Sequence, residues 1–381
     1  AFFFALKGPS FNANTFAAQA LESGARYAVI DEVVQPINDS FILVENVLKT
    51  LQDLARFHRD YLGLPVVALT GSNGKTTTKE LINAALKQRF KTIATIGNLN
   101  NHIGVPLTLL SMNADTEVGV VEMGANHANE IAFLCSIAKP NVGYITNFGK
   151  AHLEGFGSEQ GVVVAKSELY DYLKANKGLI IMNSDDAKQE KQVGRYSNTF
   201  SFSEYKQASI NISLLDSQPF LNVSLVDIVI KTHLVGVYNF HNIAAALAVG
   251  SFFNLTPQQL KSGIEAYVPA NNRSQIIQQN SNQILLDAYN ANPSSMEVAL
   301  ENFKGTQNSN KLAILGDMFE LGANSAKEHL EIVNQAILTK GCMFYFIGSY
   351  FFEQKIAHST FLFFETFKEL QSHLEEITIS N

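Results

Sequence analysis

The sequence contains only two cysteines, Cys135 and Cys342, and they lie far apart in apolar surroundings. Isolated cysteines in such contexts are usually buried thiols. We therefore expect two reduced thiols rather than a disulfide framework. This fits a protein of the cytoplasm, where thiols stay reduced.

Long apolar runs and basic runs are also missing. No window approaches the ~18 consecutive apolar residues that a membrane-spanning helix needs. The formal net charge is −7, and no basic stretch carries interleaved aromatic residues. We therefore expect no membrane span and no nucleic-acid partner. An anionic substrate remains open, because it needs only a local cluster of positive groups.

The first residues, Ala-Phe-Phe-Phe-Ala-Leu, are apolar but lack the basic segment that opens a signal peptide. We interpret them as a buried strand and expect the natural start of the chain to lie upstream. The whole chain has 381 residues, of which 46% are apolar and 17% charged. This composition predicts a globular α/β protein with two or three domains.

Residues 1–63 form the first of three regions with different patterns. Short apolar runs at Tyr27–Ile30 and Phe41–Val44 predict buried strands, and Val47–Tyr61 has helical spacing. These elements are too few for a complete large domain. We therefore interpret residues 1–63 as a partial N-terminal domain.

Residues 64–268 alternate apolar strands with amphipathic helices, which predicts a mostly parallel sheet. The expected strands are Val66–Thr70, Thr92–Thr95, Val118–Glu122, Val142–Thr146 and Leu179–Met182. The expected helices are Lys75–Gln88, Ala128–Ile137, Ser158–Lys174, Phe240–Phe253 and Thr256–Ala266. Residues 199–235 instead suggest antiparallel hairpins beside this sheet.

Residues 269–381 predict a second, smaller α/β domain, incomplete at its end, which a linker at Pro269–Arg273 precedes. The expected strands are Ile284–Asp287, Leu312–Gly316, Met343–Ile347 and Phe361–Phe364. The expected helices are Ser295–Phe303, Ala326–Leu338 and Phe367–Leu374. This domain has no phosphate-binding loop of its own.

A phosphate-binding loop lies between the strand Val66–Thr70 and the following helix. Its residues are Gly71, Ser72, Asn73, Gly74, Lys75, Thr76 and Thr77. The glycines let backbone N–H groups face phosphate oxygens, and the helix N-terminus adds partial positive charge. Lys75 can reach the β- and γ-phosphates, and the Thr76 hydroxyl can bind Mg²⁺. The alternative is a tight glycine turn with an incidental lysine.

The loop matches only the shorter pattern G-x-x-G-K-T, because Leu69 stands where the usual pattern has its first glycine. A second metal ligand is expected at Glu122, which ends the strand Val118–Glu122. Mg²⁺ prefers oxygen ligands, and ligands of open α/β sheets bind beyond the carboxyl ends of strands. The alternative for Glu122 is a solvated surface carboxylate.

A series of motifs gives the chain a wider resemblance. They are FFALKG (Phe3–Gly8), TGSNGKTT (Thr70–Thr77), GNLNNHIGVP (Gly97–Pro106), EMGAN (Glu122–Asn126), AHLEGFGS (Ala151–Ser158), AKSEL (Ala165–Leu169), His241-Asn242, NRSQ (Asn272–Gln275), DAYNANPS (Asp287–Ser294) and LGDMFELG (Leu315–Gly322). In order and spacing these motifs resemble the Mur ligase family. The resemblance implies a three-domain architecture: a partial UDP-binding domain, a central ATPase domain and a C-terminal Rossmann-like domain.

The resemblance also implies a reaction. A substrate carboxylate attacks the γ-phosphate of ATP, and an amine then attacks the acyl phosphate, which gives an amide, ADP and phosphate. The GNLNN, DAYNANP and LGDMFELG stretches point to the branch that adds D-Ala-D-Ala to UDP-MurNAc-tripeptide in peptidoglycan precursor synthesis. We expect a monomeric enzyme with ATP and two Mg²⁺ ions.

The family's catalytic and metal-binding groups map onto five residues of this chain. Lys75 corresponds to the phosphate-binding lysine, and Thr76 and Glu122 correspond to ligands of the first Mg²⁺. His152 corresponds to a ligand of the second ion, and Lys166 to a lysine that is carbamylated beside it. From the residues alone, a solvated Lys166 and a structural His152 are the alternatives.

The family's nucleotide-binding residues correspond to positions in residues 242–292 of this chain. The resemblance places Asn242 near adenine, Arg273 near phosphate and Asp287 near ribose, while Asn290 and Asn292 shape the closed site. The family often has a second asparagine three residues after Asn242, where this chain has Ala245, so adenine recognition departs from the pattern.

Two further consequences concern the C-terminal domain. Asp317 and Glu320 are expected to help bind the incoming dipeptide. Because the site is divided between domains, the C-terminal domain must close onto ATP, and Pro269–Asn272 is the expected hinge.

Two alternative functions remain open. A related ligase, of the kind that acts on other Mur substrates or on folylpolyglutamate, would share the loop, Glu122 and Lys166 but use another amine acceptor. A non-catalytic ATP-binding module would need neither His152 nor Lys166. The choice of acceptor and the effect of replacing Lys166 discriminate among the three.

Overall fold

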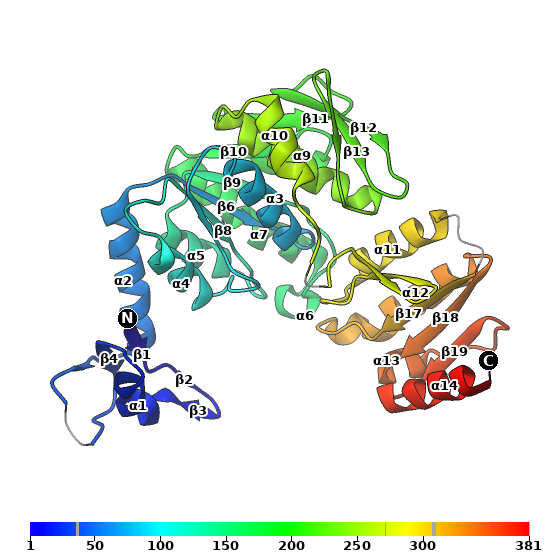
Figure 1. Ribbon diagram of the computed structural model, residues 1–381, viewed down its shortest axis with the longest axis horizontal. Helices are drawn as coiled ribbons and strands as arrows, with labels where there is room; N and C mark the ends of the chain where they lie inside the picture. The colour runs from blue at the N-terminus through cyan, green and yellow to red at the C-terminus, as the bar shows by residue number, and fades with distance from the viewer. Residues whose placement is uncertain (36–37, 271, 307–309, 381) are drawn as a thin grey trace.

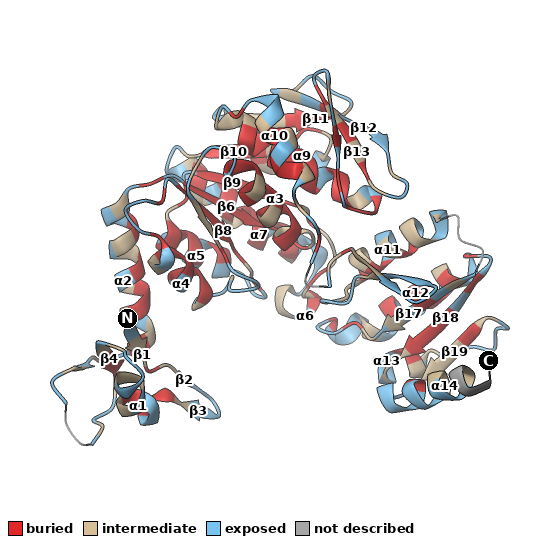
Figure 2. Ribbon diagram, viewed as in Figure 1, coloured by how far each residue is buried: buried red, intermediate tan, exposed pale blue. Residues whose placement is uncertain are grey.

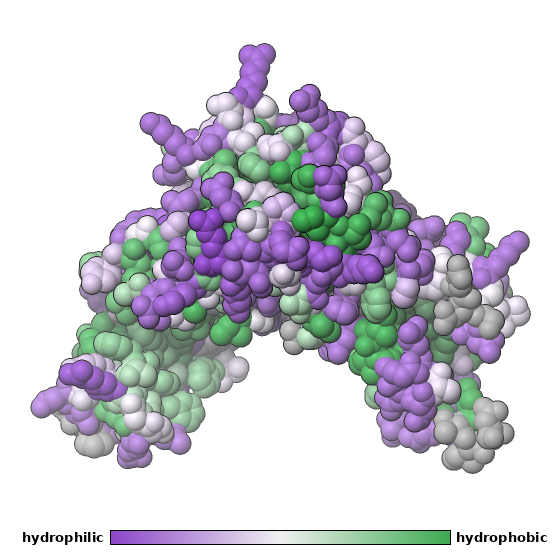
Figure 3. Space-filling model, turned by 45° about the horizontal axis from the view of Figure 1, so that its top comes forward, coloured by the Kyte–Doolittle hydropathy of each residue, from purple (hydrophilic) through white to green (hydrophobic). Residues whose placement is uncertain are grey.

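The computed structural model describes residues 1–35, 38–270, 272–306 and 310–380. Three regions form an arch, with the N-terminal region at the lower left, the central region above and the C-terminal region at the lower right (Figure 1). The space-filling view shows the two outer regions as arms that stand apart (Figure 3). Among the described residues, no helix is long and apolar enough to cross a membrane.

The N-terminal region is built on a small parallel sheet of β1 (Phe2–Phe4), β4 (Tyr27–Ile30) and β5 (Phe41–Leu43). A short hairpin of β2 (Lys7–Gly8) and β3 (Phe11–Asn12) and the helix α1 (Ala17–Glu22) complete it. The expected first strand is confirmed, but its expected burial is wrong, since Phe2 is 53% exposed. Phe2 lies on an edge strand, where its ring stacks on Tyr27 and contacts Phe4.

Helix α2 (Val47–Leu62) leads into the central region and packs on two of its helices, α4 (Gly104–Ser111) and α5 (Glu130–Ala138). The Asn46 side chain accepts a hydrogen bond from the Lys49 N–H at its start, and Gly63 ends it in a left-handed conformation. Its apolar stripe (Val47, Leu51, Ala55) is buried.

The central region contains a nine-stranded sheet in the order β14-β13-β12-β11-β10-β9-β6-β8-β7. The parallel strands are β7 (Thr92–Ala94), β8 (Val118–Glu122), β6 (Val66–Thr70), β9 (Val142–Ile145), β10 (Leu179–Asn183), β11 (Thr199–Ser203) and β12 (Ile210–Asp216). The antiparallel extension is β13 (Asn222–Leu225) and β14 (Ile228–Lys231). In this order β6 lies between β8 and β9. From β6 the chain first adds β7 and β8 on one side and then β9 on the other. Ligands bind in the crevice that such a reversal of strand order forms.

Two apolar cores cover the two faces of this sheet. On one face lie α3 (Lys75–Leu86), α9 (Phe240–Phe252) and α10 (Pro257–Glu265). On the other lie α2, α4, α5 and α7 (Glu159–Ala175). Buried residues concentrate in the sheet and in the helix faces against it (Figure 2). Strands covered on both faces explain the continuous apolar runs of the sequence.

The C-terminal region has a hairpin, β15 (Gln275–Gln279) with β16 (Asn282–Leu286), and a parallel sheet of β17 (Lys311–Gly316), β18 (Cys342–Ile347) and β19 (Phe361–Phe364). Its helices are α11 (Pro293–Gly305), α12 (Ser325–Ile337), α13 (Ser349–Glu353) and α14 (Phe367–Ser380). Its core also takes in Leu153 and Val162 of the central region.

Most expected strands and helices are confirmed within a few residues. The antiparallel hairpins expected at 199–235 are confirmed for β12 to β14. For β11 the expectation is wrong, because this strand pairs in parallel with β10. The short helices α6 (Leu153–Phe156) and α8 (Ala187–Val193) were not expected. In the expected linker and hinge, Asn271 lies outside the described residues.

Arg59 predicts a measurable stability effect. Its guanidinium donates to the carbonyls of Ala138 and Lys139 and to the Asn141 side chain at 2.9–3.0 Å, and so fastens α2 to the end of α5. We expect Arg59→Ala to lower the free energy of unfolding by about 2–4 kcal/mol, because buried acceptors lose their donors.

The matched control is Arg56→Ala on the same helix, which removes only a partly exposed ion pair with Asp53 and should cost less than about 1 kcal/mol. Chemical denaturation followed by circular dichroism measures both variants. Equal losses in the two variants would contradict the assigned role.

Candidate active site

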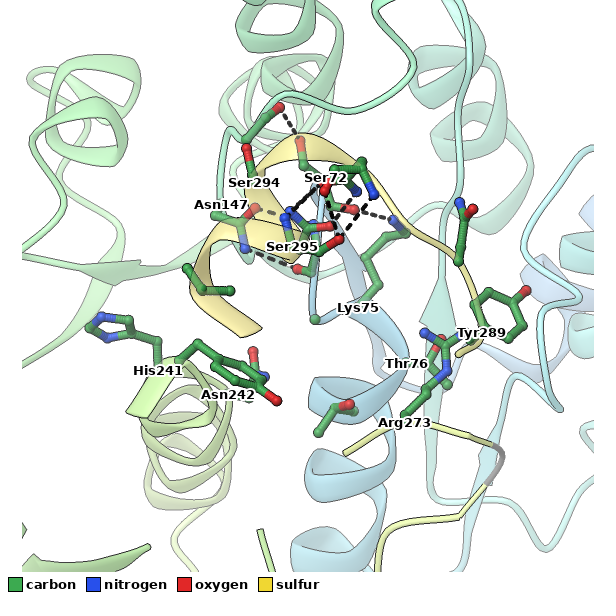
Figure 4. A pocket seen from close by; sticks show the side chains of 18 of the residues that line it. Ser72, Lys75, Thr76, Asn147, His241, Asn242, Arg273, Tyr289, Ser294 and Ser295 are labelled. Carbon is green, nitrogen blue, oxygen red and sulfur yellow. Dashed lines mark hydrogen bonds between the residues drawn. The ribbon is translucent and has the colours of Figure 1, made fainter. Parts of the chain in front are cut away.

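A cavity of about 1390 Å³ opens beyond the carboxyl ends of β6, β8 and β9. Its walls come from the phosphate loop, from the start of α9 and from residues 273–305 of the C-terminal region. Figure 4 shows Arg273 and Tyr289 on one side, with His241 and Asn242 on the opposite side of α3. The cavity therefore lies between the central and C-terminal regions.

The phosphate loop has the two special glycines that its shape requires. Gly71 has φ +141°, and a Cβ there would lie 2.0 Å from the Thr146 hydroxyl oxygen. Gly74 has φ +77°, and its Cβ would lie 2.6 Å from the Asn242 amide oxygen. A side chain at either position would thus displace the neighbouring strand or helix.

Asn147, at the end of β9, holds the loop backbone. Its side-chain oxygen accepts from the Asn73 N–H at 3.1 Å, and its side-chain nitrogen donates to the Asn73 carbonyl at 3.0 Å. The Thr146 hydroxyl donates to the same carbonyl at 2.6 Å. The loop is therefore pre-formed by its neighbour strand. The sequence offered no signal for Asn147 beyond its place after an apolar strand.

Lys75 folds back over the loop. Its ammonium donates to the carbonyls of Gly71 at 2.8 Å and Ser72 at 3.0 Å. Burial lowers the pKa of Lys75, an effect that Glu122 opposes and Arg273 reinforces. These charges place Glu122 and Arg273 within electrostatic reach of the loop lysine, as a divided phosphate site requires.

Glu122 is 1% exposed and lines the cavity. One carboxylate oxygen accepts from the Asn100 side chain at 2.7 Å, and the other is buried without a hydrogen-bond partner among the described residues. The Glu122 N–H donates to the Thr95 hydroxyl at 3.0 Å. An orphaned buried oxygen beside the Thr76-bearing loop fits a hard cation.

Asn100 and Thr95 are positioning residues that sequence reasoning missed. The GNLNN motif contained Asn100, but only the folded structure shows that this loop residue reaches Glu122. Lys79 was missed as well. Its ammonium, fully buried, donates to the Thr95 carbonyl at 2.6 Å and pairs with Glu80, and so it fastens the residue that holds the Glu122 backbone.

Lys166 is 1% exposed, so the alternative interpretation of a solvated lysine is wrong. Its amine donates to the Ala125 carbonyl at 2.9 Å and lies 4.9 Å from the centre of the Phe156 ring. Burial and the charge of Lys75 lower the pKa of Lys166 from 10.5 to about 7. Half of such amines are neutral at pH 7, and a neutral amine can attack CO₂.

His152 approaches the same group of charges. It has φ +52° at the start of α6, and its Nδ1 contacts the Glu320 carboxylate, which leaves Nε2 for a metal ion. Burial lowers the pKa of His152, opposed by Glu320 and reinforced by Lys75 and Lys166. The structure thus brings His152, Lys75 and Lys166 within mutual electrostatic reach.

The residues expected beside the nucleotide lie around the opposite wall. The Arg273 guanidinium stacks on Tyr289, 3.6 Å from the ring centre, and both residues line the cavity (Figure 4). Asp287 accepts from the Ser274 N–H and the Tyr238 hydroxyl, both at 3.4 Å. Both expected residues therefore face the cavity from the C-terminal side.

Asn242 lines the cavity, yet its side-chain amide is occupied. Its oxygen accepts from the Thr78 hydroxyl at 3.0 Å, and its nitrogen donates to the Asn239 side chain at 2.8 Å. Ala245, where the family pattern often has a second asparagine, is fully buried in the core. The Asn242 side chain thus connects α9 to the start of α3. Its contact with adenine stays a prediction.

Asn292 connects the C-terminal region to the loop. Asn292 is the N-cap residue of α11. Its side-chain nitrogen donates to the Asn73 side-chain oxygen at 2.7 Å. Asn290 is exposed and lines the cavity. Asp317 lies away from the cavity, and its carboxylate accepts from the N–H groups of Tyr350 and Phe351. This arrangement leaves Glu320, at His152, as the nearer of the two residues expected to bind dipeptide.

Among the described residues, no three His, Cys, Asp or Glu side chains cluster as a metal site. A Mg²⁺ ion that is held by one carboxylate, one hydroxyl, phosphates and water needs no such cluster. The donor set of Thr76 and Glu122 is of this kind.

Comparisons with known proteins agree with this geometry. A family model described as the Mur ligase middle domain matches residues 69–250, and one described as the Mur ligase, glutamate ligase domain matches residues 272–353. The UDP-N-acetylmuramoyl-tripeptide–D-alanyl-D-alanine ligase of Bacillus subtilis is 34% identical over 334 residues, which cover 86% of this chain and 73% of the relative.

Two solved structures are similar over nearly the whole chain. MurF from Acinetobacter baumannii has a TM-score of 0.88 at 30% identity and covers 100% of this chain and 84% of its own. MurF from Thermotoga maritima in complex with ADP has a TM-score of 0.83 at 28% identity and covers 95% of this chain and 84% of its own.

The unusual environment of Lys166 predicts its titration. In CO₂-free buffer we expect its amine to titrate near pH 7, with the neutral form above and the ammonium below. Lys75→Met should raise this pKa, because a neighbouring positive charge is removed. ¹³C NMR of lysines labelled at Cε, assigned with Lys166→Arg, measures it.

Lys174→Met is the control for this titration, since Lys174 lies on the same helix but points to Gln192 and Asp171. It should leave the pKa of Lys166 unchanged. A Lys166 titration at the ordinary 10.5 would show that its amine is solvated.

Proposed function

The chain belongs to the Mur ligase family, and we propose that its cavity joins D-alanyl-D-alanine to UDP-N-acetylmuramoyl-tripeptide at the expense of ATP. The chain is thus an ATP-dependent ligase of peptidoglycan precursor synthesis. The observation that carries this function is the convergence of Lys75, Glu122 and Lys166 with C-terminal residues on one phosphate loop. A nucleotide switch has no use for a buried, partly neutral lysine at that place.

The reaction has two steps. An oxygen of the tripeptide carboxylate attacks the γ-phosphorus of ATP, the bond to the bridging oxygen breaks, and ADP leaves. The amine of D-Ala-D-Ala then attacks the acyl-phosphate carbonyl, phosphate leaves, and the nitrogen loses a proton. Both steps bring anions together, so the site must supply positive charge.

Residues of this chain supply that charge. Lys75 would leave the loop carbonyls and bind the β- and γ-phosphates. The N-terminus of α3 would face the same phosphates. Arg273 would approach the phosphates from the C-terminal side. Asp287, beside Tyr238 and Ser274, would accept from the ribose hydroxyls.

We propose two Mg²⁺ positions. Thr76 and the free oxygen of Glu122 would hold the first, and Nε2 of His152 with carbamylated Lys166 would hold the second. When bound, Mg²⁺ neutralises phosphate charge and orients the γ-phosphate. Carbamylation converts the Lys166 amine into an oxygen-bearing anion, which is consistent with a pKa near 7.

Finer expectations on partners and place are also proposals. We propose that the enzyme acts as a monomer in the cytoplasm. Glu320 and the neighbouring cavity wall would receive the dipeptide. Closure about the segment 269–272 would bring the C-terminal residues onto bound ATP.

The function predicts acceptor-dependent turnover. With ATP, Mg²⁺ and UDP-MurNAc-tripeptide, we expect ADP release only when D-Ala-D-Ala is added. Lys166→Ala should reduce this rate at least about 100-fold, the scale of a lost electrostatic group, while Lys174→Ala should not. A coupled ADP assay measures both.

The same assay separates the alternatives. Turnover with a single amino acid instead of D-Ala-D-Ala would indicate a related ligase with another acceptor. ATP binding without any acceptor-dependent turnover, or an active Lys166→Ala variant, would indicate a nucleotide-binding module.

The proposed first metal position predicts a binding effect. Glu122→Gln should weaken Mn²⁺ binding in the presence of ADP more than tenfold, and Asn100→Ala by about tenfold, because Asn100 orients the carboxylate. Electron paramagnetic resonance of free Mn²⁺ measures both. Glu301→Gln, an exposed acid at the cavity rim, is the control, and an equal loss there would refute the position.

A further inference from the structure

Several contacts between the C-terminal region and the central region fall on one short stretch of the central region, residues 149–156, which we call the docking segment. The Lys150 N–H donates to the Ser294 hydroxyl at 2.7 Å, and the Glu154 N–H donates to the Glu320 carbonyl at 3.1 Å. Leu153 packs into the C-terminal core. The same segment carries His152, so docking and the proposed metal site share a backbone.

Lys150 makes the ionic contact of this interface. Its ammonium lies 3.2 and 3.3 Å from the two oxygens of Glu328 on α12. Glu331 on α12 and Glu159 on α7 each lie 3.9 Å away. Three carboxylates therefore surround the Lys150 ammonium.

Glu328 depends on this lysine. Its side chain is only 6% exposed, and Lys150 is its only ion-pair partner among the described residues. Without Lys150, a buried carboxylate would lose its counter-ion, which is strongly unfavourable. In addition, Glu159 of the central region would face Glu328 and Glu331 of the C-terminal region, so attraction across the interface would become repulsion.

The interface lies next to the phosphate loop. Ser294, which Lys150 contacts, is two residues after Asn292, whose side chain holds Asn73. Lys150 itself does not line the cavity within the described part of the chain. An effect of Lys150 on catalysis is therefore indirect, through the placement of the docking segment and of the C-terminal region.

We propose that Lys150 is an interdomain positioning residue, whose ion pair with Glu328 holds the C-terminal region against the phosphate loop in the ATP-competent arrangement. This inference rests on the proposed function, because it assigns the pair a role in that reaction. When the docked state is only partly populated, the apparent affinity for ATP falls by the same fraction.

The test compares Lys150→Met with Lys150→Arg in the full chain. We expect Lys150→Met to raise KM for ATP about tenfold, with a smaller fall in kcat, because it lowers the population of the docked state. Small-angle X-ray scattering should show a larger radius of gyration for this variant. Lys150→Arg should resemble the wild type in both measurements.

Two controls separate positioning from general damage. Lys327→Met removes a lysine from α12, the helix that carries Glu328. Lys327 is exposed and, among the described residues, pairs with Glu331, so this variant should change neither KM nor the radius of gyration. Glu328→Gln should raise KM about threefold, since it loses the attraction without leaving a buried charge. Lys150→Met should then add little in the Glu328→Gln background, which is the signature of coupled residues.

The proposal is overturned if Lys150→Met behaves like Lys327→Met, or if its defect is equally large in the Glu328→Gln background. Should Lys150→Met fail to fold, Glu328→Gln with its scattering profile carries the same test. A wild type without acceptor-dependent turnover would refute the proposed function, whereas scattering and ADP binding would still measure the docking contact.

Discussion

Asn147 holds both polar groups of the Asn73 backbone, and the rest of the cavity is placed relative to this contact. It fixes the phosphate loop to the end of β9 before any nucleotide is present. The close approach works only because Gly71 has no side chain to strike Thr146. On the other side of the loop, Gly74 admits Asn242, so α9 is held equally close. A rigid loop loses little entropy when phosphate binds, which is the physical advantage of this arrangement.

Buried positive charge is the second feature that organises the site. Lys79 and Lys166 are buried and Lys75 is half-buried at the cavity, and each amine is compensated differently. Lys79 has Glu80 and a carbonyl, and Lys75 has two loop carbonyls that phosphates would replace. Lys166 has one carbonyl and an aromatic ring, and its pKa falls to about 7. The least compensated amine is thus the one that can become neutral, and neutrality is the condition for carbamylation.

Much of this could be predicted from the sequence, and the limits have physical causes. Strands such as Val66–Thr70 and Val118–Glu122 were predictable because burial on both faces requires continuous apolar runs. The pairing of the strand Thr199–Ser203 was harder to predict. Its polar residues are typical of a hairpin strand, and the sequence does not show its parallel pairing with β10. Motifs located Lys75, Glu122 and Lys166, but spacing cannot reveal that Asn100 reaches Glu122 or that Asn242 is occupied by Thr78. Such contacts depend on which elements become neighbours.

The division of the site between two regions follows from the chemistry of an acyl phosphate. Water would hydrolyse that intermediate, so the cavity must be closed while it exists, yet substrates and products must pass. Polar pairs such as Lys150–Glu328 and Asn73–Asn292 join the C-terminal region to the central region. Such contacts suit both demands, because water can replace a partly exposed ion pair or hydrogen bond at modest cost. His152 lies within the docking segment and contacts Glu320 of the C-terminal region, so the proposed closure would also orient that imidazole.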